Sequence, residues 1–415
     1  MTTLAQPDAT EGGTFLVDGR HTGWFGGYSI GSAFQPIFSL AHRRAVGFEG
    51  LLRAREGAGA PVPPEQVFRS SGSEGERVRL DRLCRTVHVR NFLADRGEGW
   101  LFLNVDPRVC VRGWHYGPFF GGMLEQCGLP PHRVVVEILE GEIQDEGVLA
   151  EAVAYYRELG CLVAIDDFGA GHSNLERVAR IRPEIVKLDR SLIAQAADDT
   201  PVRRLLPGLV GLIQEAGGFA LVEGVETEEQ ALIAIDAGID FVQGYYLARP
   251  AARATAPRAV VPHLCDRFLH VANAGAGRCR EELQHYQRAF TAAADALATA
   301  QPTRECCRSL LELPRIERCY MLDMSGRQCS AELQSERRAR QPDARFAPLL
   351  DTGEAVWSCR PHFRRAAATP GRVQTSRPYR SVRGNNACIT LAVRLDGLTE
   401  PRIFCADLDW SECAA

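Results

Sequence analysis

The sequence predicts an α/β protein built as a closed (β/α)₈ barrel with an antiparallel first strand, followed by a smaller α+β domain. Over roughly 250 residues, short apolar runs typical of strands alternate with amphipathic stretches typical of helices, and eight strand positions favour a closed barrel over an open sheet. The chain has 415 residues, which is long enough for two globular domains.

Each barrel strand is predicted from an apolar run. The expected strands occupy residues 34–40, 46–52, 101–105, 134–138, 162–166, 185–188, 219–223 and 240–243, with helices between most of them, such as 148–159, 202–216 and 228–237. Residues 41–45 are too few for a crossover helix, so the first two strands are expected to run antiparallel.

The region after Pro250 differs in composition. Residues 251–262 are rich in Ala, Arg and Pro and indicate a linker, and a helix is expected from His263 to about Ala300, interrupted at 274–277. Apolar runs at 319–323, 388–393 and 403–409 then predict an antiparallel sheet. The expected domains are therefore an N-terminal extension (1–26), the barrel (27–255), a linker with a connecting helix (256–301) and the small domain (302–415).

Composition excludes several classes. The 48 basic and 52 acidic residues give a net charge of −4, so there is no footprint of a nucleic-acid-binding domain. We find neither an apolar run of about 18 residues nor a secretory signal, and we expect a cytoplasmic protein. The 14 cysteines are then expected to be reduced core residues, because no Cys-x-x-Cys occurs and the Cys306-Cys307 pair has no histidines at ligand spacing.

Lysine is almost absent. Lys187 is the single lysine among 48 basic residues, and the other 47 are arginines. Arginine serves equally well at most surface positions, whereas a compact ammonium differs where a point charge is needed in a small site. This points to a specific role for Lys187, the alternative being a chance lysine on a solvated face.

Polar residues stand at or near the carboxyl ends of the expected strands, where a barrel builds its active site. They are Glu49, Asn104, Glu137, Asp166, Asp167, Lys187, Glu223 and Gln243. Several carboxylates and an amide oxygen at one rim form an all-oxygen site for Mg²⁺ or Mn²⁺, and five acidic groups indicate two ions. The alternative is that the acids cap the helices that follow the strands.

An ordered series of motifs carries a resemblance. The motifs are Gln35-Pro36-Ile37, Glu49-Gly50-Leu51-Leu52-Arg53, Phe102-Leu103-Asn104-Val105, Glu137-Ile138-Leu139-Glu140, Asp166-Asp167-Phe168-Gly169-Ala170-Gly171, Val186-Lys187-Leu188-Asp189, Glu223-Gly224-Val225-Glu226-Thr227 and Gln243-Gly244-Tyr245. In order and spacing they resemble the EAL-domain cyclic-di-GMP phosphodiesterases. The resemblance implies a TIM-like barrel that hydrolyses cyclic di-GMP to linear pGpG with two Mg²⁺ or Mn²⁺ ions, in a protein that forms a homodimer.

The resemblance also implies roles for matching residues. Glu49, Asn104, Glu137 and Asp166 would hold the first metal, Asp167 the second, and Glu223 would be shared or close to it. Lys187 would hold and polarise the attacking water, assisted by Gln243. The residues expected to face the substrate are Gln35, Leu51, Arg53, Asp189 and Gln243.

A mobile loop follows the Asp pair in the family. Here it comprises residues 168–174, including Phe168, Gly169, Gly171 and Ser173, and Glu140 matches the glutamate that steadies it. Three positions depart from the family pattern: Gly50 replaces an alanine, and Leu139 and Ala170 stand where threonine is common. None of these changes removes an expected metal ligand.

The carboxyl-terminal region carries a second resemblance. Residues 357–366, 377–381 and 388–391 resemble the ligand-facing half of a PAS-like or Cache-like sensor. From His263 onward there are 22 basic and 18 acidic residues, and arginines are dense between Arg360 and Arg383. These arginines are expected either to bind an anionic or carboxylate ligand or to form a solvated face or an interface with the acidic barrel.

These observations predict a cyclic-di-GMP phosphodiesterase regulated by a carboxyl-terminal sensory domain. Two alternatives stay open: a non-catalytic cyclic-di-GMP receptor that signals to a protein partner, and a general dinucleotide phosphodiesterase.

Overall fold

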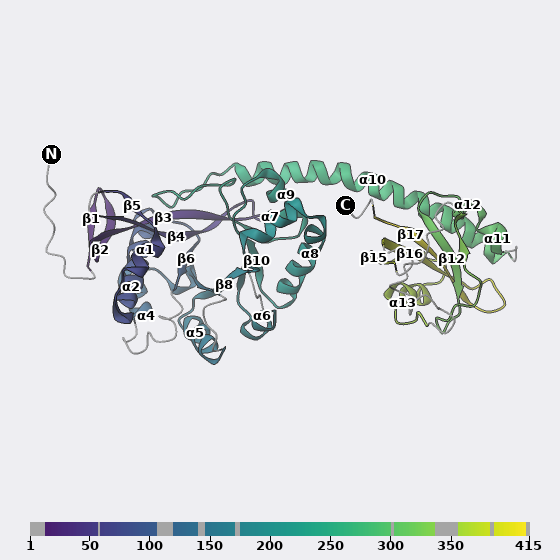
Figure 1. Cartoon of the computed structure of the whole chain (residues 1–415), viewed down its shortest axis with the longest axis horizontal. Coiled ribbons are helices and arrows are strands. Elements are labelled where there is room, and N and C mark those ends of the chain that lie inside the picture. Colours follow the sequence, from purple (N-terminus) through teal and green to yellow (C-terminus); the bar gives the residue numbers. More distant parts are fainter. Residues whose placement is uncertain are drawn as a thin grey trace. The chain divides into compact units, whose positions relative to one another are not determined.

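The computed structural model describes residues 13–56, 59–105, 119–139, 146–170, 175–299, 303–336, 356–381 and 386–411. Two compact units make up the chain, Met1–Leu269 and His270–Ala415. The long helix α10 (Val260–Ala298) begins in the first unit and continues into the second (Figure 1).

The first unit contains a closed eight-stranded barrel. Its strands are β3 (Tyr28–Ser39), β4 (Arg44–Glu56), β6 (Trp100–Asn104), β7 (Val134–Leu139), β8 (Leu162–Phe168), β9 (Ile185–Leu188), β10 (Phe219–Val222) and β11 (Phe241–Val242). The strands from β4 to β11 pair in parallel, while β3 pairs antiparallel with both β4 and β11 and closes the ring. The predicted barrel and its antiparallel first strand are confirmed.

Helices follow the strands along the chain. They are α1 (Pro64–Arg69), α2 (Glu74–Ala94), α4 (Phe120–Cys127), the 3₁₀ turn η2 (Pro131–Arg133), α5 (Glu146–Glu158), α6 (Leu175–Ile181), α7 (Arg190–Asp198), α8 (Thr200–Glu215) and α9 (Glu228–Asp236). Ser73 and Thr227 begin α2 and α9 with capping boxes, in which a side-chain oxygen accepts a hydrogen bond from the third helical N–H. Local sequence thus sets where these helices start.

An apolar layer fills the interior of the barrel. One buried side chain comes from each strand except β4: Ile37, Phe102, Val135, Ala164, Ile185, Leu221 and Phe241. On β4 the matching position is Gly47, where a side chain would collide with the ring of Phe102. Because side chains on one face of a strand recur every second residue, the residues two positions away from this layer form the next layer of the interior.

Short strands at the edges were not predicted. The strands β1 (Thr14–Val17) and β2 (Arg20–Phe25) form a hairpin that pairs with the start of β3, and β5 (Pro61–Val62) pairs with the end of β4. Part of the expected extension, residues 1–26, is therefore β-structure. The signal was the Asp18-Gly19 turn, whose two positive φ angles suit a tight hairpin.

The connection between the units differs from the expectation in two ways. Phe34 and Ala251 exchange backbone hydrogen bonds, so the expected linker at 251–262 begins against the barrel, and α10 already starts within it at Val260. The predicted interruption at 274–277 is wrong, because α10 is continuous. Two glycines cost about 1 kcal/mol each, which a long helix tolerates since propagation is far easier than nucleation.

The second unit is an antiparallel sheet with helices. Its strands are β12 (Ile316–Leu322), β13 (Leu333–Gln334), β14 (Gln374–Thr375), β15 (Tyr379–Arg380), β16 (Ala387–Leu395) and β17 (Arg402–Asp409), in the order β13-β12-β17-β16-β14 with β15 also on β16. The helices are α11 (Thr303–Cys306), α12 (Arg308–Leu311) and α13 (Pro361–Ala368). Phe290 of α10 stacks on Phe404 of β17 at 4.8 Å in the core. The predicted smaller sheet domain is confirmed.

The cysteines of the described residues agree with a role in packing. Eleven of them are free thiols, and seven of these eleven are buried. Among the described residues, no helix combines the length and the apolar character that a membrane crossing requires.

Candidate active site

A polar layer lies directly beside the apolar layer of the barrel interior. Each member stands two residues along the chain from a residue of the apolar layer, as Glu137 does from Val135 and Lys187 from Ile185. The exception is Glu49, which stands two residues from Gly47. The layer comprises Gln35, Glu49, Asn104, Glu137, Asp166, Lys187, Glu223 and Gln243, and all but Asn104 and Glu223 are buried. The fold therefore brings the predicted rim residues to one place.

Lys187 is at the centre of this layer and is only 1% exposed. Its Nζ lies 2.5 Å from Glu223 Oε1, 2.6 Å from Glu137 Oε1, 3.2 Å from Asp166 Oδ1 and 3.9 Å from Glu49 Oε1. An ammonium has three N–H donors, so it cannot satisfy four carboxylates. The lysine and its acidic partners form one electrostatic unit with more acid than base.

Two groups of carboxylates have the spacing of metal ligands. Oxygens of Glu49, Glu137 and Glu223 lie within 4.8 Å of one another, and so do oxygens of Asp166, Asp167 and Glu223. Glu223 belongs to both groups. The pattern is that of two neighbouring cation positions with one shared carboxylate.

Amide side chains orient Glu49. Asn104 Nδ2 donates to Glu49 Oε1 at 3.0 Å, and Gln243 Nε2 donates to Glu49 Oε2 at 2.7 Å and to Gln35 Oε1 at 3.2 Å. Gln35 Nε2 in turn donates to the Ala248 carbonyl. Strands that are far apart in sequence thereby fix one carboxylate of the site.

The excess of acid shows in the pKa values. Burial, reinforced by neighbouring carboxylates, raises the pKa of Glu137 well above its usual range and that of Glu223 to about 8, although Lys187 opposes both shifts. Burial alone would lower the pKa of Lys187, but Asp166, Glu137, Glu223 and Glu49 together raise it well above its usual value. The ammonium is thus kept charged, and further positive charge would stabilise the acids.

The donor set fits divalent cations. Glu137 Oε2 is buried and has no hydrogen-bond partner among the described residues, and the same holds for Gln243 Oε1. Buried oxygens without partners are costly in a folded protein. Carboxylate and amide oxygens are the ligands that Mg²⁺ and Mn²⁺ prefer.

Asp167 differs from the other acids. It is exposed, and its backbone has φ of 60°, in the left-handed region that non-glycine residues rarely adopt outside special sites. Its N–H donates to Asp166 Oδ1 at 2.9 Å, and burial, followed by the charge of Asp166, raises its pKa. This backbone turn aims two consecutive aspartates at the same region.

The expected loop begins at a tightly constrained point. Phe168 is buried as the last residue of β8, and Gly169 has φ of 102°. Glycine suits this conformation, and a Cβ on Gly169 would lie 2.3 Å from Cδ1 of Leu192, so that a larger residue would also displace the leucine. Ala170 is exposed. The loop residues Gly171 and Ser173, together with Glu140, lie outside the described residues.

A cavity of about 600 Å³ adjoins the site. Its walls include Asn104 of the polar layer and two of the residues expected to face a substrate, Leu51 and Arg53, whereas the carboxylates of the two metal-ligand groups do not line it. Arg53 is exposed and donates to the Leu52 carbonyl. Asp189 is not among the residues that line this cavity, and its Oδ1 caps α7 by accepting from Ser191 N at 2.9 Å.

Sequence reasoning missed other residues that line this cavity. Arg85 and Asp81 form a buried ion pair on α2, and His88 of the same helix lies against Gly50. Burial lowers the pKa of His88 to about 3, with the nearby Arg53 acting in the same direction. The i, i+4 spacing of Asp81 and Arg85 was a usable signal, but the contact with Gly50 had none in the sequence.

Comparison with known proteins identifies the family. The family model for the EAL domain matches residues 29–250, more than half of the chain. The Escherichia coli protein named probable cyclic di-GMP phosphodiesterase PdeN is 30% identical over 223 residues, which cover 52% of this chain and 43% of that protein. The Pseudomonas aeruginosa cyclic di-GMP phosphodiesterase RocR is 36% identical over 239 residues, covering 57% of this chain and 59% of RocR.

This chain therefore matches less than two thirds of the length of either relative. Among solved structures, the Bacillus subtilis YkuI protein, described as having an EAL domain, superposes with a TM-score of 0.75 at 22% identity. That alignment covers 92% of this chain and 96% of YkuI, so the two proteins share the fold of both units. By the match over residues 29–250, this chain belongs to the EAL-domain family.

Proposed function

We propose that this protein hydrolyses cyclic di-GMP to linear pGpG, using two divalent cations, Mg²⁺ or Mn²⁺, at the barrel rim. The observation that carries the proposal is the pair of carboxylate groups that share Glu223 around the buried Lys187. The name of RocR, a cyclic di-GMP phosphodiesterase, and that of PdeN, a probable cyclic di-GMP phosphodiesterase, support the choice of substrate.

When bound, two divalent cations would neutralise negative charge on the phosphate and lower the pKa of the attacking water. Glu49, Glu137 and Glu223 would hold one of them, and Asp166, Asp167 and Glu223 the other. This differs from the set that the resemblance implies, in which Asp166 belongs to the first metal with Glu49 and Glu137. Asn104 would contribute its amide oxygen or orient Glu49, to which it donates a hydrogen bond.

Lys187 keeps its proton because four carboxylates surround it. In the reaction it would orient the attacking water by donating a hydrogen bond, and its compact ammonium suits the limited space. Gln243 would support this arrangement by fixing Glu49, which it contacts at 2.7 Å.

The substrate would enter through the cavity of about 600 Å³. Arg53 would bind a phosphate oxygen through a charge-assisted hydrogen bond, with Leu51 in the same cavity wall. Gln35 would face the substrate from the polar layer, where it accepts a hydrogen bond from Gln243. The further assignments stay proposals: Asp189 toward the substrate, Glu140 with the loop of Gly169, Gly171 and Ser173, a homodimer, and regulation through a PAS-like or Cache-like second unit.

The test is direct incubation of the full chain with cyclic di-GMP and Mg²⁺ or Mn²⁺, with separation of products by chromatography. Linear pGpG is expected, and Glu49→Ala should abolish its formation. Tight binding with no product over long incubation would contradict catalysis and favour the receptor. Equal rates on pGpG would indicate a general dinucleotide phosphodiesterase instead.

A further inference from the structure

The second unit contains a cavity that the proposed reaction does not use. Its volume is about 490 Å³, within the range of small-molecule sites. It lies among β12, helix α13 and residues 376–381, so one unit supplies all of its described walls. We propose that this cavity binds a small organic anion, a carboxylate or phosphate carried on a planar group.

Arginines dominate the charge of the walls. Arg318, Arg360, Arg365, Arg377 and Arg380 line the cavity, and no acidic residue does so among the described lining residues. Guanidinium groups stay charged at any physiological pH and bind carboxylates and phosphates through paired N–H donors. Like charges around one cavity repel each other, and a bound anion would relieve that repulsion.

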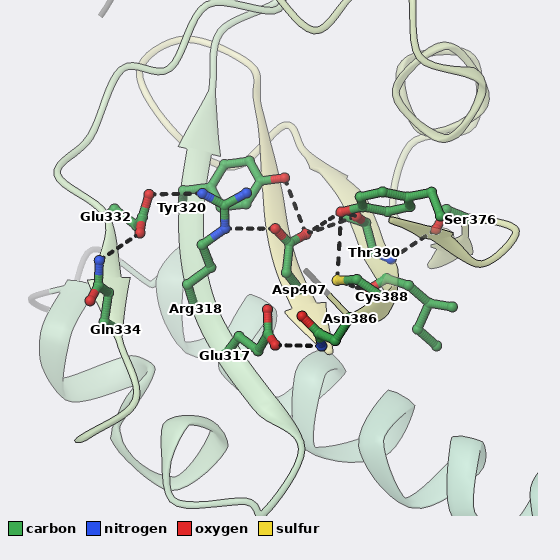
Figure 2. A network of polar contacts seen from close by, with 12 residues as sticks. Glu317, Arg318, Tyr320, Glu332, Gln334, Ser376, Asn386, Cys388, Thr390 and Asp407 are labelled. Carbon is green, nitrogen blue, oxygen red and sulfur yellow. Dashed lines mark hydrogen bonds and ion pairs between the residues drawn. The ribbon is translucent and has the colours of Figure 1, made fainter. Parts of the chain in front are cut away.

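One of these arginines is already neutralised. Arg318 Nε donates to Asp407 Oδ2 at 2.6 Å, and its Nη1 donates to Glu332 Oε2 at 2.9 Å. Figure 2 shows Asp407 between Arg318 on one side and Thr390 on the other, with Thr390 Oγ1 donating to Asp407 Oδ1 at 2.8 Å. Arg318 is therefore held by acids, and its charge is not available to a ligand.

The same network fixes the aromatic walls. The hydroxyls of Tyr320 and Tyr379 both donate to Asp407 Oδ1 at 3.3 Å (Tyr320 in Figure 2). Each tyrosine lines the cavity, and Trp357 is a third aromatic wall. Rigid rings held in place by hydrogen bonds offer flat surface to a planar group.

Arg360 and Arg377 are the arginines free to bind an anion. Both are exposed, and neither forms an ion pair within the described part of the chain, whereas Arg365 donates to the Thr375 carbonyl. Cζ of Arg360 lies 5.8 Å from the centroid of the Trp357 ring, so a cation and an aromatic surface stand side by side. A ligand with an anionic end and a flat body would match both.

Two further features point to an anion. His362 lines the cavity, is only 8% exposed, and its imidazole makes no hydrogen bond to any described residue. Arg360, Pro361 and His362 form the start of α13, and no side chain caps that helix end. Pro361 has no N–H, but the N–H groups of the next residues in the first turn lack partners inside the helix and favour negative charge.

The experiment is titration calorimetry on the full chain with four probes. Benzoate and phenyl phosphate test the two anion types on a ring, benzamide is the neutral counterpart of benzoate, and inorganic phosphate lacks the ring. We expect saturable binding of benzoate or phenyl phosphate, and at least about tenfold weaker binding of benzamide and inorganic phosphate.

The variant Arg360→Gln/Arg377→Gln should weaken binding of the better probe by at least about tenfold. Arg372→Gln changes an exposed arginine of the same unit outside the cavity and should leave binding unchanged. All substituted side chains are exposed, so the melting temperature should stay constant. The proposal is wrong if neither benzoate nor phenyl phosphate binds saturably. It is also wrong if the double variant binds the better probe as tightly as the parent protein does.

Discussion

A methyl group on Gly50 would lie 3.1 Å from Cγ of His88, closer than side chains normally pack. His88 is fully enclosed on α2, and its Nδ1 lies 2.7 Å from Ser32 Oγ. An alanine at this position would press on the histidine, which would have to shift by a few tenths of an ångström. Gly50 and His88 form a matched pair next to the metal-ligand residue Glu49.

Gly50→Ala should therefore destabilise the protein by about 1 kcal/mol, the lower end of the cost of overpacking. The check is a double-mutant cycle by denaturant unfolding with Gly50→Ala, His88→Ala and both changes. The alanine should cost markedly less when His88 is already alanine. An unchanged cost in that background would show that the two residues do not compete for space.

His88 should also make the protein sensitive to acid. Its folded-state pKa of about 3 lies below the ordinary value of 6.5, so the unfolded chain binds a proton that the folded chain does not. The contribution of His88 to the free energy of unfolding is fully present above about pH 6.5. Between pH 6 and 4 it falls by up to about 1.4 kcal/mol for each unit by which the pH is lowered. Denaturant unfolding across this range should show the slope for the parent and a smaller slope for His88→Gln. The exposed His132→Gln is the control, and an unaltered slope in His88→Gln would contradict the assignment.

Glu223→Gln separates metal binding from folding. Burial places the pKa of Glu223 near 8, so without metal the neutral form is favoured at pH 7 and glutamine should change stability by less than about 1 kcal/mol. The increase in melting temperature on adding Mn²⁺ should disappear, and hydrolysis should fall by at least about 100-fold. Glu215→Gln, an exposed change on α8, should leave both unchanged. A full Mn²⁺ shift in Glu223→Gln would refute the shared carboxylate.

Lys187→Arg keeps the charge but changes its shape. The site is 1% exposed and bounded by four carboxylates, so the larger planar guanidinium must displace at least one of them. We expect hydrolysis to fall by at least about 100-fold, with circular dichroism confirming that the variant is folded. The exposed Arg204 on α8 provides a matched control, Arg204→Lys, which should leave the rate of hydrolysis unchanged. Near-normal turnover in Lys187→Arg would show that the lysine does not orient the attacking water.

Arg53→Gln should weaken the binding of the substrate more than its conversion. Arg53 lines the cavity that Asn104 also borders, and it forms no ion pair with a carboxylate of the described residues. Loss of a charge-assisted hydrogen bond to phosphate should raise KM about tenfold with kcat little changed. Arg55→Gln, two residues along the same strand and outside the cavity, is the control. If kcat falls and KM stays constant, Arg53 acts on the reacting atoms instead.

The sequence alone determined the barrel, its antiparallel first strand and the set of polar residues at the rim. Apolar runs mark the strands, and the two-residue period of a strand places Glu137, Asp166 and Lys187 on the face of their apolar neighbours. Parallel strands then bring these residues to one end of the barrel. Local patterns were sufficient for each of these steps.

Only the tertiary structure decided how these residues meet. Gln243 and Glu49 are 194 residues apart, yet they share a buried hydrogen bond, and Glu223 joins both carboxylate groups. The contact of His88 with Gly50, the β1–β2 hairpin and the arginine-lined cavity likewise depend on segments that approach only after folding. Packing and long-range hydrogen bonds set these relationships, because burial makes each orientation depend on distant neighbours.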